Sequence, residues 1–433
     1  MGRYILRNRF GAVFLLVALV FLLSCAEKRT ELTFMVGGAP NEVEYWERLM
    51  NEFEKRSGLD VRIIRQPTDS DQRRQGLVVA LESRQGDPDV FLMDVVWIGQ
   101  FAASGWLEPI GPLAEKTKFP TQPFFRRIID YADLYQDTLF ALPIYVDGGL
   151  LYYRKDLLAK YGYDAPPETW EELLEYSLEV QKGERLENPH FYGFVWQGAQ
   201  YEGLVCTFLE FAASNDGAIA KDDRKIQLNT VQNTEALMFM RQLIHAYQVS
   251  PPNTFTEMKE EEVRNFFQRG NALFERNWPY AWKLHENEVS PVRGKVGIAP
   301  LPHFLGGESV SALGGWHVGI SRYSDAKEQA WDLVKFITSY ETEKKLMLNL
   351  GWNPGRRDLY HDNEVMEKFP HLPILKMIFE NSVSRPALPH YARLSEAIQR
   401  YLSGCLSGQM DAQDALDHAQ QEIEKIEKTY NEI

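Results

Sequence analysis

The sequence contains little cysteine and no cysteine motif of a metal site or redox site. Three cysteines occur among 433 residues: Cys25, Cys206 and Cys405. Two isolated cysteines in the body of the chain are not the disulfide framework of a small secreted domain. They could pair in an oxidising compartment, but we expect Cys206 to be buried and unpaired. CxxC, HExxH and clustered His/Cys/Asp patterns are also missing, so no metal and no cofactor is predicted.

Positive charge is also scarce. The chain has 47 lysines and arginines against 61 aspartates and glutamates, which gives a formal net charge of -14 at pH 7. Such a surface does not suit nucleic acid or an anionic membrane face, so neither is expected as a direct partner. The total says nothing about the ligand, because a binding site can differ from the average surface.

A long apolar run occurs at the N-terminus, over residues 10–23, and is short for a transmembrane helix. Three arginines precede it, an order typical of a secretory signal peptide. The run ends at Leu-Leu-Ser-Cys, which resembles a bacterial lipobox. We therefore expect residues 1–24 to be a lipoprotein signal peptide, Cys25 to be lipidated and to anchor the protein to the membrane, and residues 25–31 to be a tether. The alternative is a soluble secreted protein with a chance cysteine.

The rest of the chain is longer than one hydrophobic core usually supports, so two domains are expected. Its first part predicts strands over residues 32–36, 61–64 and 89–93, with helices over 41–56 and 72–83 between them. The first helix is expected to bury one apolar stripe, formed by Trp46, Leu49, Met50 and Phe53. Asn41 is its expected N-cap, with Glu44 three residues on. Strands that alternate with helices predict parallel sheets. Ligands bind at the carboxyl ends of such strands, and Asp94 lies at one of these ends.

A second α/β unit is predicted from a strand over residues 150–153 onward. Thr169 and Glu172 form a capping box for its next helix. A strand over residues 296–302 ends in prolines and is interpreted as another crossing between the domains. A surface helix over residues 410–430 is expected to pack on the second domain.

Aromatic residues make up 12% of the chain, and many lie beside carboxylates or in loops rich in glycine and proline. Examples are Tyr145 with Asp147, NWPYAW at 277–282 and GGWH at 314–317. A pyranose has apolar C–H faces that stack on aromatic rings, and its hydroxyls accept charge-assisted hydrogen bonds from arginines and donate them to carboxylates. The mixture favours a neutral carbohydrate ligand. For any single tryptophan, a place in the hydrophobic core is the alternative.

Several segments resemble the trehalose/maltose-binding proteins of archaeal and bacterial ABC importers. They are GGAPNEVEYW (37–46), RQPTDSDQRR (65–74), DPDVFLMDVVWIGQFAASGWLEP (87–109), ALPIYVDGGLLYYRKDLL (141–158), FVWQGAQYEGLVC (194–206), NALFERNWPYAW (271–282), GGWHVGIS (314–321) and GWNPGR (351–356). The resemblance runs from about residue 32 to the C-terminus. It implies an α/β, two-lobe periplasmic-binding-protein fold (type II, flytrap) with hinge crossings. Residues 32–143 and 302–350 are then assigned to the N-lobe, and 144–301 and 351–433 to the C-lobe.

The resemblance also implies which residues contact the sugar. They are Glu42, Thr68, Arg73, Asp94, Tyr145, Asp147, Trp278, Tyr280, Gly315, Trp316 and Arg385. Trp278 and Arg385 are expected on the C-lobe side, Tyr145 and Asp147 near the hinge, and the first four with Trp316 on the N-lobe side. The loop at 65–74 has Ser70-Asp71 where the family has Thr-Glu, a change that could tilt the preference among disaccharides. For Arg356 in GWNPGR, a structural role is favoured over a sugar contact.

These inferences predict a non-enzymatic, monomeric, extracytoplasmic binding protein. It would capture a disaccharide (trehalose, maltose or a related glucoside) and deliver it to the permease subunits of an ABC transporter. One alternative is a secreted carbohydrate-active enzyme, such as a glycosidase that uses two of these carboxylates, whose separation the sequence does not reveal. Another is a binding protein that supplies a sugar to a chemoreceptor or sensor.

Overall fold

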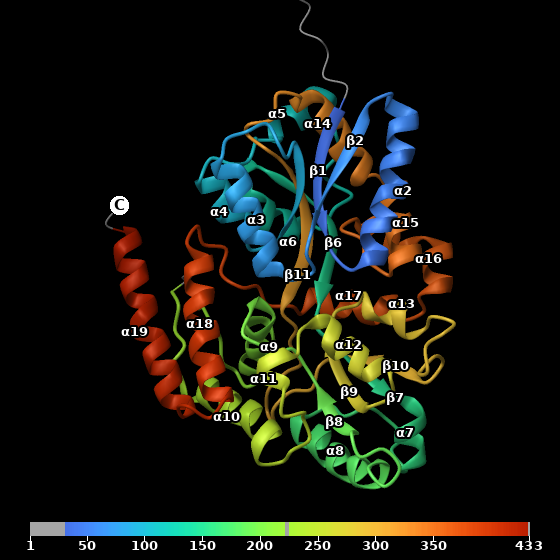
Figure 1. Cartoon of the computed structure of the whole chain (residues 1–433), viewed down its shortest axis with the longest axis vertical. Helices are drawn as coiled ribbons and strands as arrows, with labels where there is room; N and C mark the ends of the chain where they lie inside the picture. Colours follow the sequence, from blue (N-terminus) through green and yellow to red (C-terminus); the bar gives the residue numbers. More distant parts are fainter. Residues whose placement is uncertain (1–30, 221–224, 432–433) are drawn as a thin grey trace, which may run out of the picture.

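The computed structural model describes residues 31–220 and 225–431. The predicted signal peptide and the predicted lipidation site at Cys25 lie outside this part of the chain. Two lobes stand one above the other in Figure 1, and each is built around one large β-sheet. Within the described ranges, no helix combines the length and the apolar character needed to cross a membrane.

The upper lobe in Figure 1, the N-lobe, contains a five-stranded sheet with the order β2-β1-β3-β11-β6. Its strands are β1 (Glu31–Gly37), β2 (Asp60–Gln66), β3 (Val90–Asp94), β6 (Ala141–Gly148) and β11 (Leu313–Ile320). β1 is parallel to β2 and β3, as predicted. The prediction of a parallel sheet is wrong for β11, which is antiparallel to both neighbours. β11 differs because the chain returns from the other lobe and enters this sheet from the opposite end.

The lower lobe, the C-lobe, contains a four-stranded sheet with the order β10-β7-β9-β8. Its strands are β7 (Leu150–Arg154), β8 (Tyr192–Val195), β9 (Ala272–Asn277) and β10 (Val296–Ala299). Only β8 and β9 pair in parallel, so a parallel sheet is wrong for most of this lobe as well. β10 pairs with β7 inside the sheet. β10 is therefore part of the C-lobe sheet and not the predicted crossing between the domains. The chain crosses to the N-lobe after β10, in residues 300–312.

The chain passes between the two sheets at closely neighbouring places. Only Gly149 separates the end of β6 from the start of β7. β11 then returns beside β6, and after α15 (Tyr340–Leu350) the chain runs along β6 again, where Tyr145 bridges to Pro354. These adjacent passages form the connection between the two lobes. The exact lobe boundaries, at 143/144, 301/302 and 350/351, stay a prediction.

The first helix, α2 (Pro40–Ser57), buries Trp46, Leu49, Met50 and Phe53 on one stripe, as predicted. Its predicted N-cap, Asn41 with Glu44, is wrong. Proline is well suited to a helix's first position, and Pro40 starts the helix after Ala39. The backbone N–H of Ala39 donates to Oε2 of Glu42 at 2.8 Å. The N-cap therefore lies two residues before the predicted one, and Glu42 takes the N3 position that was expected for Glu44.

The remaining helices cover the two sheets and the region between them. In the N-lobe they are α3 (Ser70–Glu82), α4 (Ile98–Ala103), α5 (Gly111–Thr117), α6 (Arg126–Ile128) and α14 (Lys327–Ile337). In the C-lobe they are α7 (Lys155–Lys160), α8 (Trp170–Glu184), α9 (Glu202–Ala213), α10 (Val231–His245), α11 (Thr254–Glu257), α12 (Glu260–Gln268), α18 (Tyr391–Leu406) and α19 (Ala412–Asn431). α13 (Ala281–His285), α16 (Asn363–Lys368) and α17 (Leu372–Glu380) contribute to a core cluster that also contains residues of β6, β7 and β11.

Several local predictions are confirmed in the C-lobe. The Thr169 hydroxyl accepts from the N–H of Glu172, which closes the capping box at the start of α8. The predicted C-terminal helix is α19, and it packs on α18 and α10. Cys206 is buried, as is Cys405, and neither forms a disulfide within residues 31–220 and 225–431.

Candidate functional site

Three neighbouring strands of the N-lobe sheet bring distant residues side by side. In β11, Trp316 pairs with Asp94 at the end of β3 on one side and with Tyr145 of β6 on the other. Gly314 is paired with Asp147 in the same way. More than 160 positions separate Trp316 from either partner along the chain. The long-range register of β11 therefore assembles the floor of the site.

The glycines of β11 allow the strand to approach its neighbours closely. Gly315 has φ 138°, and a Cβ there would lie 2.5 Å from the carbonyl oxygen of Tyr145. An L side chain at this position would be strained and would clash with backbone. Gly315 is thus a backbone requirement of the site.

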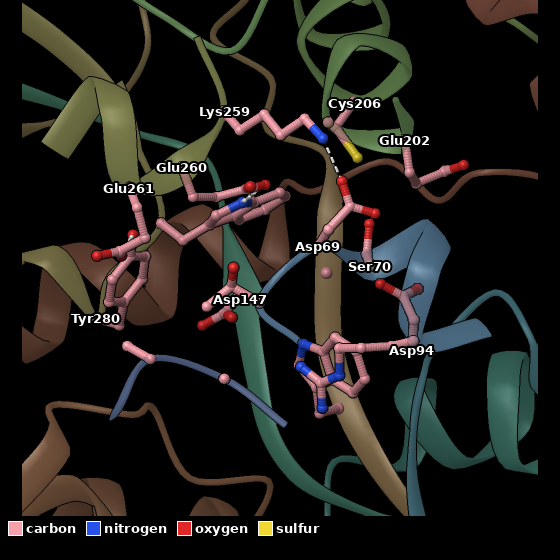
Figure 2. Close-up of a pocket in the computed structure, with 18 of the residues that line it drawn as sticks. Asp69, Ser70, Asp94, Asp147, Glu202, Cys206, Lys259, Glu260, Glu261 and Tyr280 are labelled. Carbon is pink, nitrogen blue, oxygen red and sulfur yellow. Dashed lines mark hydrogen bonds and ion pairs between the residues drawn. The ribbon is translucent and has the colours of Figure 1, made fainter. Parts of the chain in front are cut away.

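A cavity of about 650 Å³ lies between the lobes, and all eleven residues predicted from the sequence line it. In Figure 2, Asp69, Ser70 and Asp94 lie on one side, Glu260, Glu261 and Tyr280 on the other, and Asp147 between them. Trp278 and Trp316 both face the same space and both are half-buried. Neither tryptophan is fully buried in a hydrophobic core. The cavity therefore contains the predicted mixture of aromatic rings and ionisable groups.

The cavity is strongly acidic. Its carboxylate-bearing residues are Glu42, Asp69, Asp94, Asp147, Glu202, Glu257, Glu260, Glu261 and Glu262, whereas its basic residues are Arg73, Lys259 and Arg385. An anionic ligand would meet repulsion from those of these carboxyl groups that are ionised. A neutral ligand rich in hydroxyls can instead donate to the carboxylates and accept from the arginines.

Glu42 is held in place by two hydrogen bonds. Besides the Ala39 N–H, it accepts from Nε1 of Trp352, which lies 3.0 Å from Oε1. The Trp352 ring in turn stacks near Tyr145, with 4.2 Å between ring centres. Burial raises the pKa of Glu42 from its ordinary value to about 7. The carboxyl group is thus fixed in orientation at the edge of the cavity.

Arg73 lies against Trp316 and has unused hydrogen-bonding capacity. Its guanidinium carbon is 3.5 Å from the centre of a Trp316 ring, and the side chain is buried. Burial lowers the pKa of Arg73 to about 10. Among the described residues, Nε of Arg73 has no hydrogen-bond acceptor. Because a buried donor without a partner is costly, this group is suited to binding an oxygen-rich ligand.

Arg385 was expected on the C-lobe side. In the structure it joins the two lobes. Its Nη1 donates to Glu202 of α9 at 2.7 Å, and its Nη2 donates to Asp94 of β3 at 3.2 Å. The hydroxyls of Tyr391 and Ser395 also donate to Glu202. Arg385 lines the cavity, yet most of its charge is compensated inside the protein.

Further contacts join the lobes around the cavity. Lys259 forms an ion pair with Asp69, marked by the dashed line in Figure 2. Arg74 of α3 pairs with Glu396 of α18 at 3.1 Å, and Gln399 of α18 donates to Asp71 at 3.4 Å. The described conformation is therefore one in which the lobes touch across the cleft.

Several cavity residues escaped the sequence analysis. Trp352 lies in the quoted GWNPGR segment, where an aromatic residue among glycine and proline is a usable signal. Lys259, Glu260 and Glu261 belong to a charge run that resembles a solvated helix face, so nothing local marks them. Arg356 is confirmed in a structural role: its guanidinium pairs with Asp358 at 2.7 Å, and it is not among the cavity-lining residues.

The buried carboxyl groups predict a pH-dependent stability. Burial, with Glu42 and Asp94 nearby, raises the pKa of Asp147 from 3.8 to about 8. Between these two values the folded state binds more protons than the unfolded state, so the Asp147 contribution is complete below about pH 4 and is lost as the pH rises toward 8. Thermal midpoints of the ligand-free protein measured between pH 5 and pH 8 should fall less for Asp147→Asn than for the wild type. The exposed Asp325→Asn is the control. Identical pH profiles for Asp147→Asn and wild type would contradict this assignment.

Comparisons with known proteins agree with the architecture and the cleft. Residues 39–344 match the family model described as "Bacterial extracellular solute-binding protein". The chain is 35% identical over 405 residues to the "Probable ABC transporter-binding protein" of Deinococcus radiodurans, covering 92% of this chain and 93% of that protein. The solved structure "Maltose bound T. maritima MalE3" has a TM-score of 0.87 and 38% identity, covering 92% of this chain and 99% of that one. A solute-binding protein of Thermotoga lettingae bound to α-D-tagatose has a TM-score of 0.83 and 28% identity, covering 92% and 99%.

Proposed function

The chain belongs to the family of bacterial extracellular solute-binding proteins, and from that premise we propose that it captures an uncharged disaccharide and delivers it to an ABC importer. Members of this family are binding proteins and not enzymes, so the glycosidase alternative is set aside. Trehalose, maltose or a related glucoside is the proposed ligand. The proposal also includes the lipid anchor at Cys25, a monomeric state, and docking on the transporter's membrane-spanning subunits.

One observation carries the proposal: aromatic rings and carboxylates from both lobes line a single cavity. The same cavity is lined by Arg73, a buried arginine whose Nε has no acceptor among the described residues. A disaccharide offers flat C–H faces to Trp278 and Trp316. Its hydroxyls can donate to Asp147 and Asp94 and accept from Arg73. Each such bond contributes only about 0.5–1.5 kcal/mol, or up to about 3 kcal/mol with a charged partner, so affinity requires several of them together with exclusion of water. The maltose bound to MalE3 of T. maritima supports a glucoside.

Closure of the lobes is the proposed signal to the transporter. A ligand shifts an open–closed equilibrium only if it binds the closed form better than the open one. Here the difference would arise because Trp278 comes from one lobe while Asp94, Arg73 and Trp316 come from the other. The ion pairs between Lys259 and Asp69 and between Arg74 and Glu396 would add to the closed form's stability.

A thermal-shift panel tests this proposal. The purified mature protein is heated with trehalose, maltose, sucrose, a neutral amino acid and a uronic acid, each as a separate sample. A disaccharide at a hundred times its Kd should stabilise the native state by about 2.7 kcal/mol, which corresponds to a rise of about 3 °C in Tm for a protein of this length. If no disaccharide raises Tm while the amino acid or the uronic acid does, the proposed ligand class is wrong.

A further inference from the structure

Arg276 lies behind the Trp278 ring. It is the fifth residue of β9, two positions before the tryptophan, and its guanidinium carbon is 4.1 Å from the centre of a Trp278 ring. Trp278 lines the cavity, whereas Arg276 is 1% exposed and is not among the lining residues. The guanidinium therefore covers the indole from the protein side and leaves its other face to the cavity.

Glu210 of α9 fixes the plane of this guanidinium. Nε of Arg276 donates to Oε2 at 2.7 Å and Nη2 donates to Oε1 at 2.5 Å, while Nη1 donates to Gln197 at 3.1 Å. Both members of the pair are 1% exposed. A bidentate arginine–carboxylate pair is rigid because its two parallel bonds permit only one relative orientation.

The pair is also built into the connection between the lobes. A Cβ at Gly149, the single residue between β6 and β7, would lie 2.0 Å from Oε1 of Glu210. The N–H of Ala312, just before β11, donates to the same oxygen at 3.1 Å. Glu210 and Arg276 therefore occupy a fixed position relative to β6, β7 and β11, the strands at which the chain passes between the lobes.

Two edges of the Trp278 indole are restrained as well. Its Nε1 donates to Glu260 at 3.4 Å. On the six-membered ring, Cζ3 lies 3.0 Å from the position that a Cβ at Gly314 would occupy, so the strand backbone at Gly314 packs tightly against this edge. With a rear face and two edges held, the indole presents one face in one orientation.

We propose that Arg276 is a positioning residue that makes the site select a pyranose ring over an acyclic polyol. This inference rests on the proposed function. A pyranose face contacts the indole over many atoms at once, but only if the indole plane is already fixed parallel to it. An acyclic polyol has the same hydroxyls and no flat face, so it gains much less from a fixed plane. Loss of the backing would impose an ordering cost mainly on the ring-shaped ligand.

The variant that tests this is Glu210→Gln combined with Arg276→Met. Removal of Arg276 alone would leave a buried carboxylate without its partner and could unfold the protein, whereas the paired replacement removes both charges and leaves the net charge unchanged. Affinities for maltose, or for trehalose if the panel selects it, and for the linear hexitol sorbitol are measured by competition. Trp278→Ala and the triple variant complete the set.

We expect the paired variant to bind the disaccharide about tenfold more weakly and sorbitol less than twofold more weakly, which lowers the ring-over-polyol selectivity at least fivefold. In the Trp278→Ala background, the same pair should cause less than a twofold further loss of disaccharide affinity. Equal losses for both ligands, or losses that add fully to that of Trp278→Ala, would overturn the inference and indicate a general packing role. A wild-type protein that binds no disaccharide would instead refute the proposed function.

Discussion

Arg385→Ala should destabilise the folded protein by about 3–5 kcal/mol, the usual cost of removing one partner from a buried ion pair. Arg385 is 2% exposed and is shared by Glu202 and Asp94, which come from different lobes. Its removal would leave Glu202 buried with only hydroxyl donors. Urea denaturation of the ligand-free protein measures the change.

The exposed ion pair between Arg62 and Asp87 provides the control for this experiment. Both side chains are nearly half exposed, so Arg62→Ala should change the free energy of unfolding by no more than about 1 kcal/mol. If Arg385→Ala costs no more than the control, the network that joins the lobes through Arg385 is not a source of stability, and the residue's principal role would be contact with the ligand.

Asp94→Ala and Trp316→Ala should each weaken disaccharide binding tenfold or more, or at least about 1.4 kcal/mol. Asp94 offers a charged acceptor at the end of β3, and Trp316 offers an aromatic surface directly beside it in the sheet. The two substitutions differ in their side effects, because Asp94 also accepts from Arg385 and from the N–H of Val96. Isothermal titration calorimetry with the disaccharide selected by the thermal-shift panel gives both affinities.

Trp282→Ala is the matched control for Trp316→Ala. Trp282 lies in the same aromatic segment as Trp278 but contacts His371 and is not among the residues that line the cavity. Its replacement should leave the affinity within about twofold of wild type, well below the tenfold change that corresponds to 1.4 kcal/mol. Unchanged affinity for both Asp94→Ala and Trp316→Ala would place the ligand elsewhere.

Local features of the chain were predictable where one short segment contains all the relevant information. The apolar run before Asp94 predicted β3 and its end, and the stripe of Trp46, Leu49, Met50 and Phe53 predicted the buried face of α2. The cap of α2 was misassigned because Asn41 and Pro40 are both good signals one residue apart. The direction of β11 was missed because strand orientation depends on where the chain comes from, which no local pattern records.

Sequence patterns and the family resemblance were enough to predict the two-lobe α/β class and eleven residues, all of which line one cavity. Tertiary structure alone decided how they are arranged: Asp94, Trp316 and Tyr145 become neighbours through the antiparallel register of β11, and Arg385 connects the lobes. Only the tertiary structure revealed that Arg276 lies behind Trp278, and that four glutamates at 257 and 260–262 line the cavity. The physical reason is that helix and strand periodicity are local, whereas burial of a charge or the backing of a ring depends on chain segments far apart in sequence.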